Sequence, residues 1–436
     1  MNPTADPHSL RRAERTYHVF VRRNLTRNYL VHLVHGMLGQ TGFRLVNAPT
    51  FLPAFILMLS GGSDLAVGLA LSLQSLGMML TPLIGANLIE HRTRVLPIGF
   101  ITGAGMRLMI LFIALAGLYF AATPALILIM ICLLFLGLFQ GMQGVIFNVL
   151  MAKVIPVNKR GRLTGLRNFL AGIISAVLAW LAADIFLGDE PAAAGYSYTF
   201  LVAFLLTSLG LVSLLLVREP EPPTIRPKTN LLYRLREMPA LLRDDPAFTK
   251  YFLARSLATM GRMALPFYIL YAGKSIGLTG TTLGVVTFAF TLAGTISNLP
   301  WGALADRSGF RNTFLWSIAL WVASTLLLLV SDGLLMTAVV FAGIGAAVQG
   351  FQNASVNLTL EFGHRDDLPL RIAIANTTSE FAGTIGPLLG GILAMTLGHI
   401  WVFWASIAFL VIGGAVVRIY VPEPRFNTTS AAAARR

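Results

Sequence analysis

Long apolar blocks, separated by short polar connections, run through most of the chain. A helix that crosses the hydrocarbon core of a bilayer needs about 20 mainly apolar residues, and these blocks are close to that length or longer. Twelve blocks can be distinguished, at residues 29–59, 66–90, 96–121, 124–152, 163–187, 197–217, 249–273, 280–303, 313–331, 334–361, 372–396 and 399–421. The pattern predicts an all-α polytopic membrane protein with twelve transmembrane helices.

The polar connections alternate in charge. Arginine and lysine are concentrated in residues 91–94, 153–162, 218–250, 307–311 and 365–371. The connections between them contain Asp64, Asp189, Glu190 and Asp332, with Lys274 as the one basic residue. Because positively charged connections stay on the cytoplasmic side, we predict that both termini are cytoplasmic. We expect a plasma-membrane location, in the inner membrane of a bacterium.

Composition agrees with this picture. Hydrophobic residues make up 56% of the chain and charged residues 12%, whereas soluble domains carry about 25% charged residues. The formal net charge of +14 would suit nucleic-acid binding, but the basic residues lie in the connections of one side. We therefore expect the lipid bilayer, and no nucleic acid, as the partner of these charges. The single cysteine, Cys132, excludes an intramolecular disulfide.

One long hydrophilic connection divides the chain into halves. The expected organisation is a basic cytoplasmic segment at 1–28, an N-terminal six-helix bundle at 29–217, a cytoplasmic central loop at 218–248, a C-terminal six-helix bundle at 249–421 and a cytoplasmic tail at 422–436. Residues 231–243 of the loop interleave Leu, Tyr and Met with Arg and Glu. This pattern is typical of an amphipathic helix on a membrane surface.

The two halves share a repeated pattern. Gln140-Gly141-Met142-Gln143 recurs 209 residues later as Gln349-Gly350-Phe351-Gln352, and Asn148 recurs as Asn357 at the same offset. Arg44 and Arg262 also correspond, and each precedes a proline (Pro49, Pro266) by four or five residues. Many transporters are built from two structural repeats with a binding site between them.

The stretch 302–311 resembles the G-x-L-A-D-R-x-G-x-R signature of the major facilitator superfamily of secondary transporters. Its signature residues are Gly302, Asp306, Arg307, Gly309 and Arg311. We expect Gly302 to allow close helix approach, Asp306 to cap or pair near a helix end, and Gly309 to form the turn. The first-half counterpart, which contains Glu90 and Arg92, is degraded. The resemblance implies that both stretches are gating loops, and that two six-helix bundles form the fold.

In that family's fold, the first, fourth, seventh and tenth helices line a central cavity. Polar residues of this chain are concentrated on those four spans. Gln40, Arg44, Asn47 and Phe51 share one helical stripe, as do Arg255, Thr259, Arg262 and Pro266. The predicted substrate-binding residues are Gln40, Arg44, Asn47, Gln140, Gln143, Arg262, Gln349, Gln352 and Asn353.

Arg44 and Arg262 lie near the middle of their spans, where an arginine costs about 3 kcal/mol on insertion scales. One interpretation is that both guanidinium groups face an anionic substrate with forked hydrogen bonds. The other is structural, with each arginine capping carbonyls freed by the nearby proline or pairing with a carboxylate. For the glutamines and asparagines, the alternative to binding is hydrogen bonding between helices.

Glu380 is the one carboxylate deep inside a span. Burial favours the neutral acid and a nearby arginine favours the ion, and this balance suits a proton carrier. The alternative is a fixed ion pair with Arg262 or another arginine. The following residues 383–391 resemble a glycine- and proline-rich pattern of family antiporters, there on the fifth helix. They predict a closely packed, bendable eleventh helix.

Three further polar residues lie inside spans. We interpret His32 and His35 as interfacial histidines with water partners, with a proton relay as the alternative. Arg107 is on the third span, which the family pattern places against lipid. It either turns inward near Gln74 or extends to the cytoplasmic surface.

No enzyme constellation, phosphate-binding loop or Cys/His cluster is present, so we expect no catalysis, no cofactor, no metal and no direct ATP drive. The predicted function is proton-coupled secondary transport of a small amphipathic or anionic molecule by a monomer, with export slightly favoured. The alternatives are uptake of an organic anion by symport, ligand sensing without transport, and lipid flipping.

Overall fold

The computed structural model describes residues 7–222, 242–362, 368–421 and 423. In these ranges every regular element is a helix. Ten helical segments are long and apolar enough to cross a membrane. The other two expected spans are the seventh, which is divided into three short helices, and the eleventh, which contains Glu380. All twelve expected spans coincide with helical segments to within a few residues.

The first six spans follow a separate N-terminal helix, α1 (Pro7–Arg23). They are α2 (Leu25–Val46) with α3 (Phe51–Leu59), α4 (Asp64–Glu90), α5 (Leu96–Tyr119), α6 (Ala122–Val154), α7 (Val157–Ala182) with the π-helix η1 (Ala183–Leu187), and α8 (Ala193–Ser213) with the 3-10 turn η2 (Leu214–Leu216).

The remaining six spans begin with α10 (Pro246–Met260), the 3-10 turn η3 (Gly261–Ala264) and α11 (Leu265–Ile276). They continue with α12 (Gly280–Ile296) and α13 (Asn298–Ser308), α14 (Phe310–Leu329), α15 (Gly333–Leu360), α16 (Leu368–Thr396) and α17 (His399–Tyr420). Helices suit these apolar sequences because they satisfy every backbone hydrogen bond within one segment.

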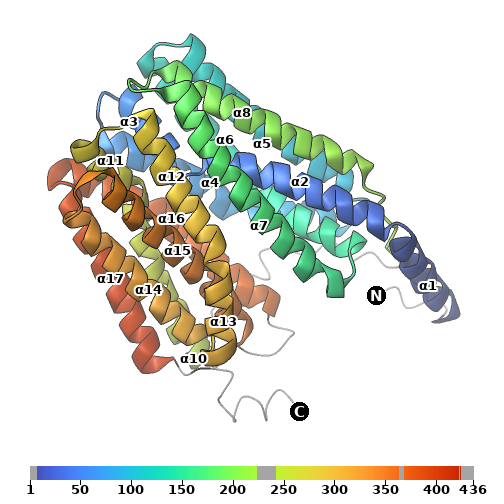
Figure 1. Ribbon diagram of the computed structural model, residues 1–436. Coiled ribbons are helices and arrows are strands. Elements are labelled where there is room, and N and C mark those ends of the chain that lie inside the picture. Colours follow the sequence, from blue (N-terminus) through green and yellow to red (C-terminus); the bar gives the residue numbers. More distant parts are fainter. Residues whose placement is uncertain (1–6, 223–241, 363–367, 422, 424–436) are drawn as a thin grey trace.

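The helices form two groups that lie side by side (Figure 1). Helices α2 to α8 make up the first group, drawn blue to green, and α10 to α17 the second, drawn yellow-green to red. The groups meet mainly where α4 packs on α16 and where α7 packs on α12. The predicted amphipathic helix of the central loop, residues 231–243, lies outside the described residues except for its last two positions.

Prolines interrupt the two spans that carry the central arginines. The first span leaves the helix between Val46 and Phe51, around Pro49, which lacks an N–H group and restricts the residue before it. The seventh span tightens into η3 directly before Pro266. The two polar stripes were predicted on continuous helices, and this expectation is wrong: the first stripe runs past the end of α2 at Val46, and the second passes through the 3-10 turn η3.

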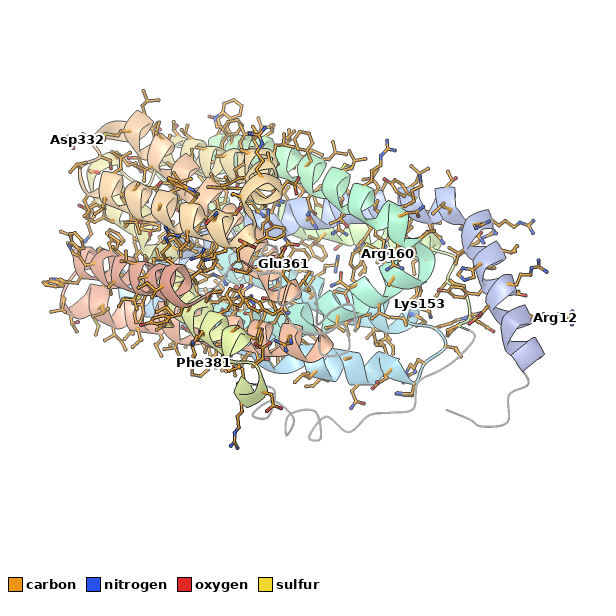
Figure 2. The ribbon with its side chains drawn as sticks, turned by 90° about the horizontal axis from the view of Figure 1, so that it is seen from below. Arg12, Lys153, Arg160, Asp332, Glu361 and Phe381 are labelled. Atoms are coloured by element: carbon orange, nitrogen blue, oxygen red, sulfur yellow. The ribbon has the colours of Figure 1, made fainter. Side chains whose placement is uncertain are left out.

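The two ends of the helix bundle differ in charge. Figure 2 shows Arg12, Lys153 and Arg160 toward one end and Asp332 at the other. We call the first the basic end; it contains residues 91–95, 155–156, 217–222 and 309. The opposite end contains residues 60–63, 120–121, 188–192, 277–279, 330–332 and 397–398.

The glycine-rich part of α16 packs tightly against α4. A Cβ at Gly68 would lie 2.3 Å from the carbonyl oxygen of Pro387 and 3.1 Å from Gly391 Cα. Side chains cannot fit at such a distance, so glycines at both positions let the backbones of the two helix groups touch. The predicted close packing of residues 383–391 is confirmed.

Candidate functional site

A cavity of about 510 Å³ lies between the two helix groups. Seven of the nine predicted binding residues border it, so polarity on the four chosen spans was a good guide to its lining. They are Gln40, Arg44, Asn47, Gln140, Arg262, Gln349 and Gln352. The fifth and eighth spans also contribute, through Asn168 of α7 and through Phe290, Thr291 and Gly294 of α12. We call this space the central cavity.

Arg44 reaches from the first helix group to the second. Its Nη1 donates to Thr295 Oγ1 of α12 at 3.1 Å, and its Nη2 donates to the carbonyl oxygen of Asn168 at 3.5 Å. Neither partner is a carboxylate or a carbonyl freed by Pro49. The structural interpretation of Arg44 therefore named the wrong partners. The side chain instead links α2 to α7 and α12.

Arg262 is the less constrained of the two arginines. It comes from η3, borders the central cavity and is half-buried. Among the described residues, no hydrogen bond or ion pair holds its guanidinium group. All five of its N–H donors therefore remain available on the cavity side.

Amide side chains link the helices around the cavity. Gln74 Nε2 of α4 donates to Asn47 Oδ1 at 2.7 Å and to Gln140 Oε1 at 3.3 Å. With its amide in the orientation that hydrogen bonding favours, Gln40 donates to Asn168 Oδ1 at 2.8 Å and accepts from Arg167 Nη2 at 3.2 Å. All except Gln74 border the cavity, and they also make the interhelical bonds that were the alternative interpretation.

Two predicted residues do not border the central cavity. Gln143 is buried inside the first group, where its Oε1 accepts from Thr102 Oγ1 at 2.7 Å. Asn353 Oδ1 accepts from Gln349 Nε2 at 3.0 Å, and its Nδ2 donates to Asn298 Oδ1 at 2.6 Å. The corresponding residues Gln143 and Gln352 thus have different environments, although their sequence motifs repeat.

The other members of the two stripes are structural. Phe51 is fully buried in the core of the first group. Arg255 donates from Nη1 to Thr359 Oγ1 at 3.0 Å and from Nη2 to Ser379 Oγ at 3.1 Å. Arg255 therefore joins α10 to α15 and α16, while Thr259 is buried beside it.

Glu380 lies where α16 meets α4 and is half-buried. A Cβ at Gly383 would lie 3.8 Å from Glu380 Oε2 and 3.1 Å from Ser75 Oγ of α4. Arg262 is the charged group that acts on this carboxyl group. No ion pair or hydrogen bond joins the two side chains in the described structure, so the predicted fixed pair is not formed.

The signature stretch is mostly helical. α13 continues through Ser308, and Gly309 alone forms the turn, with φ of +85°. The expectation for Gly302 is wrong, because a Cβ there would meet nothing within 4 Å. Asp306 and Arg307 are exposed near the C-terminal end of α13. Arg311 Nη2 donates to the carbonyl oxygen of Arg418 at 2.6 Å.

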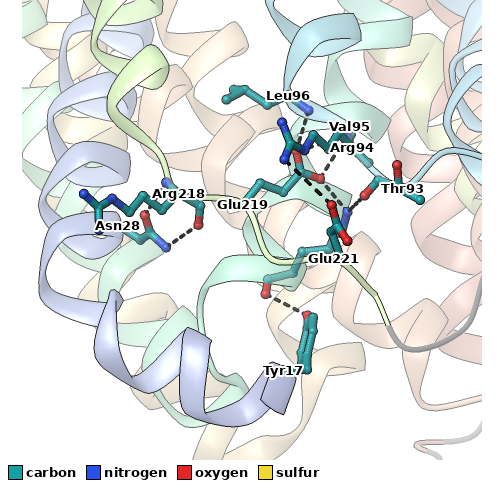
Figure 3. A network of polar contacts seen from close by, with 10 residues as sticks. Tyr17, Asn28, Thr93, Arg94, Val95, Leu96, Arg218, Glu219 and Glu221 are labelled. Carbon is teal, nitrogen blue, oxygen red and sulfur yellow. Dashed lines mark hydrogen bonds and ion pairs between the residues drawn. The ribbon is translucent and has the colours of Figure 1, made fainter. Parts of the chain in front are cut away.

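Each helix group ends with a glutamate that caps its third span, which we did not predict. Glu219 accepts hydrogen bonds from the backbone N–H groups of Val95 and Leu96 at 2.8 and 2.9 Å and forms an ion pair with Lys153 (Figure 3). Glu423 Oε2 accepts from the N–H of Arg311 at 3.0 Å. The repeated Glu-Pro sequences after the sixth and twelfth spans were the available signal.

Helix α1 contacts the basic end of the first group through Tyr17. Tyr17 donates its hydroxyl proton to the carbonyl oxygen of Lys153 at 2.8 Å (Figure 3). Burial raises the pKa of Tyr17, so the phenol stays a neutral donor. Near the predicted first gating loop, Arg94 lies 3.7 Å from Glu221 at the surface, and Arg92 is exposed next to Glu90.

The opposite end carries a polar contact between the helix groups. Lys274 Nζ lies 3.0 Å from His399 Nδ1, and His399 Nε2 lies 3.0 Å from Asp64 Oδ1. Because an ammonium group can only donate, Nδ1 accepts and Nε2–H donates to the carboxylate. We call Lys274, His399 and Asp64 the opposite-end triad. One feature of the sequence pointed to this contact: Lys274 is the one basic residue in the connections of that side.

Three interior residues lie elsewhere than predicted. Arg107 does turn inward, but toward α8 rather than Gln74: its Nε donates to the carbonyl oxygen of Thr207 at 2.7 Å. His32 and His35 are buried against Phe147 instead of lying at the interface. Small residues on the facing helices leave space for these buried rings. Arg167 of α7, which we did not single out, lies beside the two histidines.

Comparisons with known proteins agree with this architecture. A sequence profile described as Major Facilitator Superfamily matches residues 37–258 and again residues 251–436. A solved D-xylose-proton symporter is similar in fold, with a TM-score of 0.70 and 14% identity, over 92% of this chain and 99% of that one.

Similarity in sequence extends over shorter segments. An uncharacterized MFS-type transporter, Rv1250 of Mycobacterium tuberculosis, is 30% identical over 139 residues, 31% of this chain and 24% of the relative. Azole resistance protein 1 of Saccharomyces cerevisiae is 25% identical over 171 residues, 39% of this chain and 27% of the relative. The chain thus matches about a quarter of the length of each of these two proteins.

Proposed function

This chain belongs to the Major Facilitator Superfamily, and from that premise we propose that it is a proton-coupled secondary transporter of a small anionic or amphipathic molecule. The substrate would bind in the central cavity. The single observation that carries the proposal is Arg262, whose guanidinium group borders this cavity without a partner among the described residues.

The charge of the central cavity supports an anionic group on the substrate. Arg44 and Arg262 border it from the two helix groups, and its described lining contains no Asp or Glu. A carboxylate or phosphate between them would receive forked, charge-assisted hydrogen bonds from both groups. Arg44 already has neutral partners, so we expect Arg262 to make the larger contribution to affinity.

We propose that Glu380 carries the coupled proton. Its carboxyl group lies between the helix groups and is influenced by Arg262. An anion bound to Arg262 would reduce the positive field on Glu380 and favour its protonation. Substrate and proton would then bind cooperatively, as symport requires. Antiport would require substrate and proton to oppose each other's binding. The sign of the coupling between Arg262 and Glu380 therefore distinguishes symport from antiport.

Alternating access would use the division at residues 218–248. We propose that the two bundles at 29–217 and 249–421 rock about the central cavity. The opposite-end triad and the contact of Gly280 N–H with the carbonyl oxygen of Gly188 at 2.6 Å would close one side. We assign the basic end to the cytoplasm by its arginines and lysines.

Export is one candidate direction. It is favoured by the name of one relative, azole resistance protein 1. Uptake is the other, since the solved D-xylose-proton symporter shares the fold. Direct measurement of the coupling sign decides between them.

The first experiment is thermal unfolding of the purified protein against matched anionic, cationic and neutral compounds. A ligand that binds only the folded protein stabilises it by about 2.7 kcal/mol at a hundredfold excess over its Kd. We expect stabilisation by anions that Arg262→Gln removes and Asn312→Ala, on the outer face of α14, retains. Stabilisation by cations alone, unchanged in Arg262→Gln, would contradict the anion site.

A further inference from the structure

We propose that the first helix group contains a second anion-binding site, separate from the central cavity, in which Arg107 and Arg167 hold one small oxyanion or carboxylate group. The site is a pocket of about 260 Å³ between α2, α5, α6 and α7. Gln40, Phe43 and Gln140 separate it from the central cavity, because they border both spaces.

Arg107 forms one wall of this pocket and is only 3% exposed. Its Nε donates to the carbonyl oxygen of Thr207 and its Nη1 to that of Gly103, each at 2.7 Å. The guanidinium carbon lies 5.7 Å from the centre of the Phe43 ring. Nη2 has no hydrogen-bond partner among the described residues, so its two N–H groups are left for a ligand.

Arg167 forms the facing wall and is 8% exposed. Its aliphatic stem crosses α2 at Gly36, where a Cβ would lie 1.6 Å from Arg167 Cδ. The guanidinium carbon lies 5.3 Å from the centre of the Phe147 ring. Among the described residues, the one polar side chain that hydrogen-bonds to it is Gln40, whose Oε1 lies 3.2 Å from Nη2 and 3.3 Å from Nε. The chain thus brings a second buried cation to the pocket.

No counter-charge accompanies these two cations. The described lining of the pocket contains no Asp or Glu. Elsewhere between α2 and α8, the described carboxylates lie near helix ends or in connections: Asp64, Glu90, Asp184, Asp189 and Glu190. Buried charges are costly unless they are paired, and carbonyls, an amide and two ring faces provide only part of the compensation. An oxyanion with forked hydrogen bonds would supply the rest.

Size restricts the ligand. Pockets for drug-sized ligands span about 300–1,000 Å³, and this pocket is smaller. It suits an inorganic phosphate or sulfate, or the single carboxylate of a larger molecule that reaches in past Phe43. These two sources share one chemistry and differ in whether the bound group is free or belongs to the transported molecule.

The test is calorimetric titration of the purified protein with inorganic phosphate and with sulfate at constant ionic strength, with chloride as the reference anion. The protein is kept in phosphatidylcholine nanodiscs, so that no anionic lipid competes. We expect specific binding in the wild type, at least tenfold weaker in Arg167→Gln and intermediate in Arg167→Lys. Arg262→Gln serves as the central-cavity control: it should remove only phosphate bound in the central cavity and change the Kd of the Arg167-dependent binding by less than twofold.

Folding of each variant is checked by its unfolding midpoint in chloride, and Arg107→Lys is a second variant if Arg167→Gln unfolds. Absence of phosphate or sulfate binding above chloride would overturn the proposal, as would equal binding in Arg167→Gln. Loss of binding in Arg262→Gln alone would assign the anion to the central cavity and also overturn it.

A second titration, with a saturating transported anion present, distinguishes the sources. Unchanged phosphate binding identifies a free anion in the pocket, and competition that depends on Arg167 identifies a group of the transported molecule. Failure of transport leaves the phosphate result unaffected, so the two proposals fail separately.

Discussion

The interiors of the two helix groups differ in the sign and pairing of their charges. In the described first group, Arg44, Arg107 and Arg167 lie inside helices, and its carboxylates lie at helix ends. The second group places Glu380 deep in α16. It also contains Arg255, which has neutral partners, and Arg262, which has no hydrogen-bond partner in the described part of the chain. Two bundles with the same helix order therefore present different chemistry to the space between them.

Because their interior charges differ, we expect the two groups to differ in what they can bind and in whether they can exchange a proton. A group of fixed cations suits the binding of anions, since arginine stays charged at all physiological pH values. A carboxyl group beside an arginine can change its charge, so the second group has an interior carboxyl group suited to proton exchange, whereas the titratable interior residues of the first group include His32 and His35. Repetition of the fold thus preserves the framework of helices, while a few interior residues give the two described groups different charges.

The largest expected effect comes from removing the carboxyl group of the second bundle. Glu380→Gln keeps the shape of the side chain and cannot release a proton. We expect a pH gradient to drive no accumulation in proteoliposomes, while exchange of the anion across the membrane continues. Asp332→Asn, in an exposed connection at the opposite end, is the matched control. Gradient-driven transport in Glu380→Gln would contradict its role and make the two bundles alike.

A smaller effect should separate the two cavity arginines. A charge-assisted hydrogen bond contributes about 1.5–3 kcal/mol, which is roughly tenfold to a hundredfold in Kd. Arg262→Gln should therefore weaken anion binding within this range. Arg44→Gln should weaken binding less and lower the unfolding midpoint more, because it removes the bonds to Thr295 and Asn168. Calorimetry and thermal unfolding measure both; the reverse order would sink this distinction.

The sequence predicted seven of the residues that line the central cavity but few of their contacts. Polar residues inside a membrane span must face protein or water, so the positions of Gln40, Arg44, Arg262 and Gln349 could be inferred from their spans alone. Partners depend on side chains from distant helices. The bond from Arg44 to Thr295, 251 residues away, has no local sequence signal.

Breaks in the helices were harder to place. Pro49 and Pro266 were visible, yet the direction of the chain beyond each one depends on how the neighbouring helices pack. Phe51 therefore lies in the core although it shares the period of Gln40. Arg167 was overlooked because it follows the basic connection at the start of the fifth span, where arginines are common. Only the fold shows that it points inward at Gly36.

A conformational effect of about tenfold is expected at the opposite-end triad, where the charges are reversed. There the first group supplies the carboxylate, Asp64, and the second group supplies Lys274 and His399. Asp64→Asn should weaken the contact by about 1.4 kcal/mol and shift the population tenfold toward states open at this end. Spin labels at the exposed residues 119 and 335, in a cysteine-free background, report the opening.

Ser63→Ala is the matched control for Asp64→Asn. It removes the helix-capping bond from Ala66 N–H to Ser63 Oγ, at 3.2 Å, without touching the triad. Destabilisation of α4 alone would affect both variants equally. Equal distance distributions in Asp64→Asn and Ser63→Ala would therefore show that the triad does not hold the two groups together.

The last prediction compares two glycines, one in each bundle, and its smallest effect is at Gly302. A Cβ at Gly36 would overlap Arg167, so Gly36→Ala should cost about 1–3 kcal/mol of the free energy of unfolding. Gly302 of the signature stretch is exposed with nothing within 4 Å, so Gly302→Ala should stabilise α13 by about 0.5–1 kcal/mol, the usual preference of a helix for alanine. Thermal unfolding measures both.

If Gly302→Ala stabilises the protein yet slows transport, the glycine is needed in another conformation, where α13 meets the first bundle. Unchanged transport would instead leave the signature glycine without a packing role.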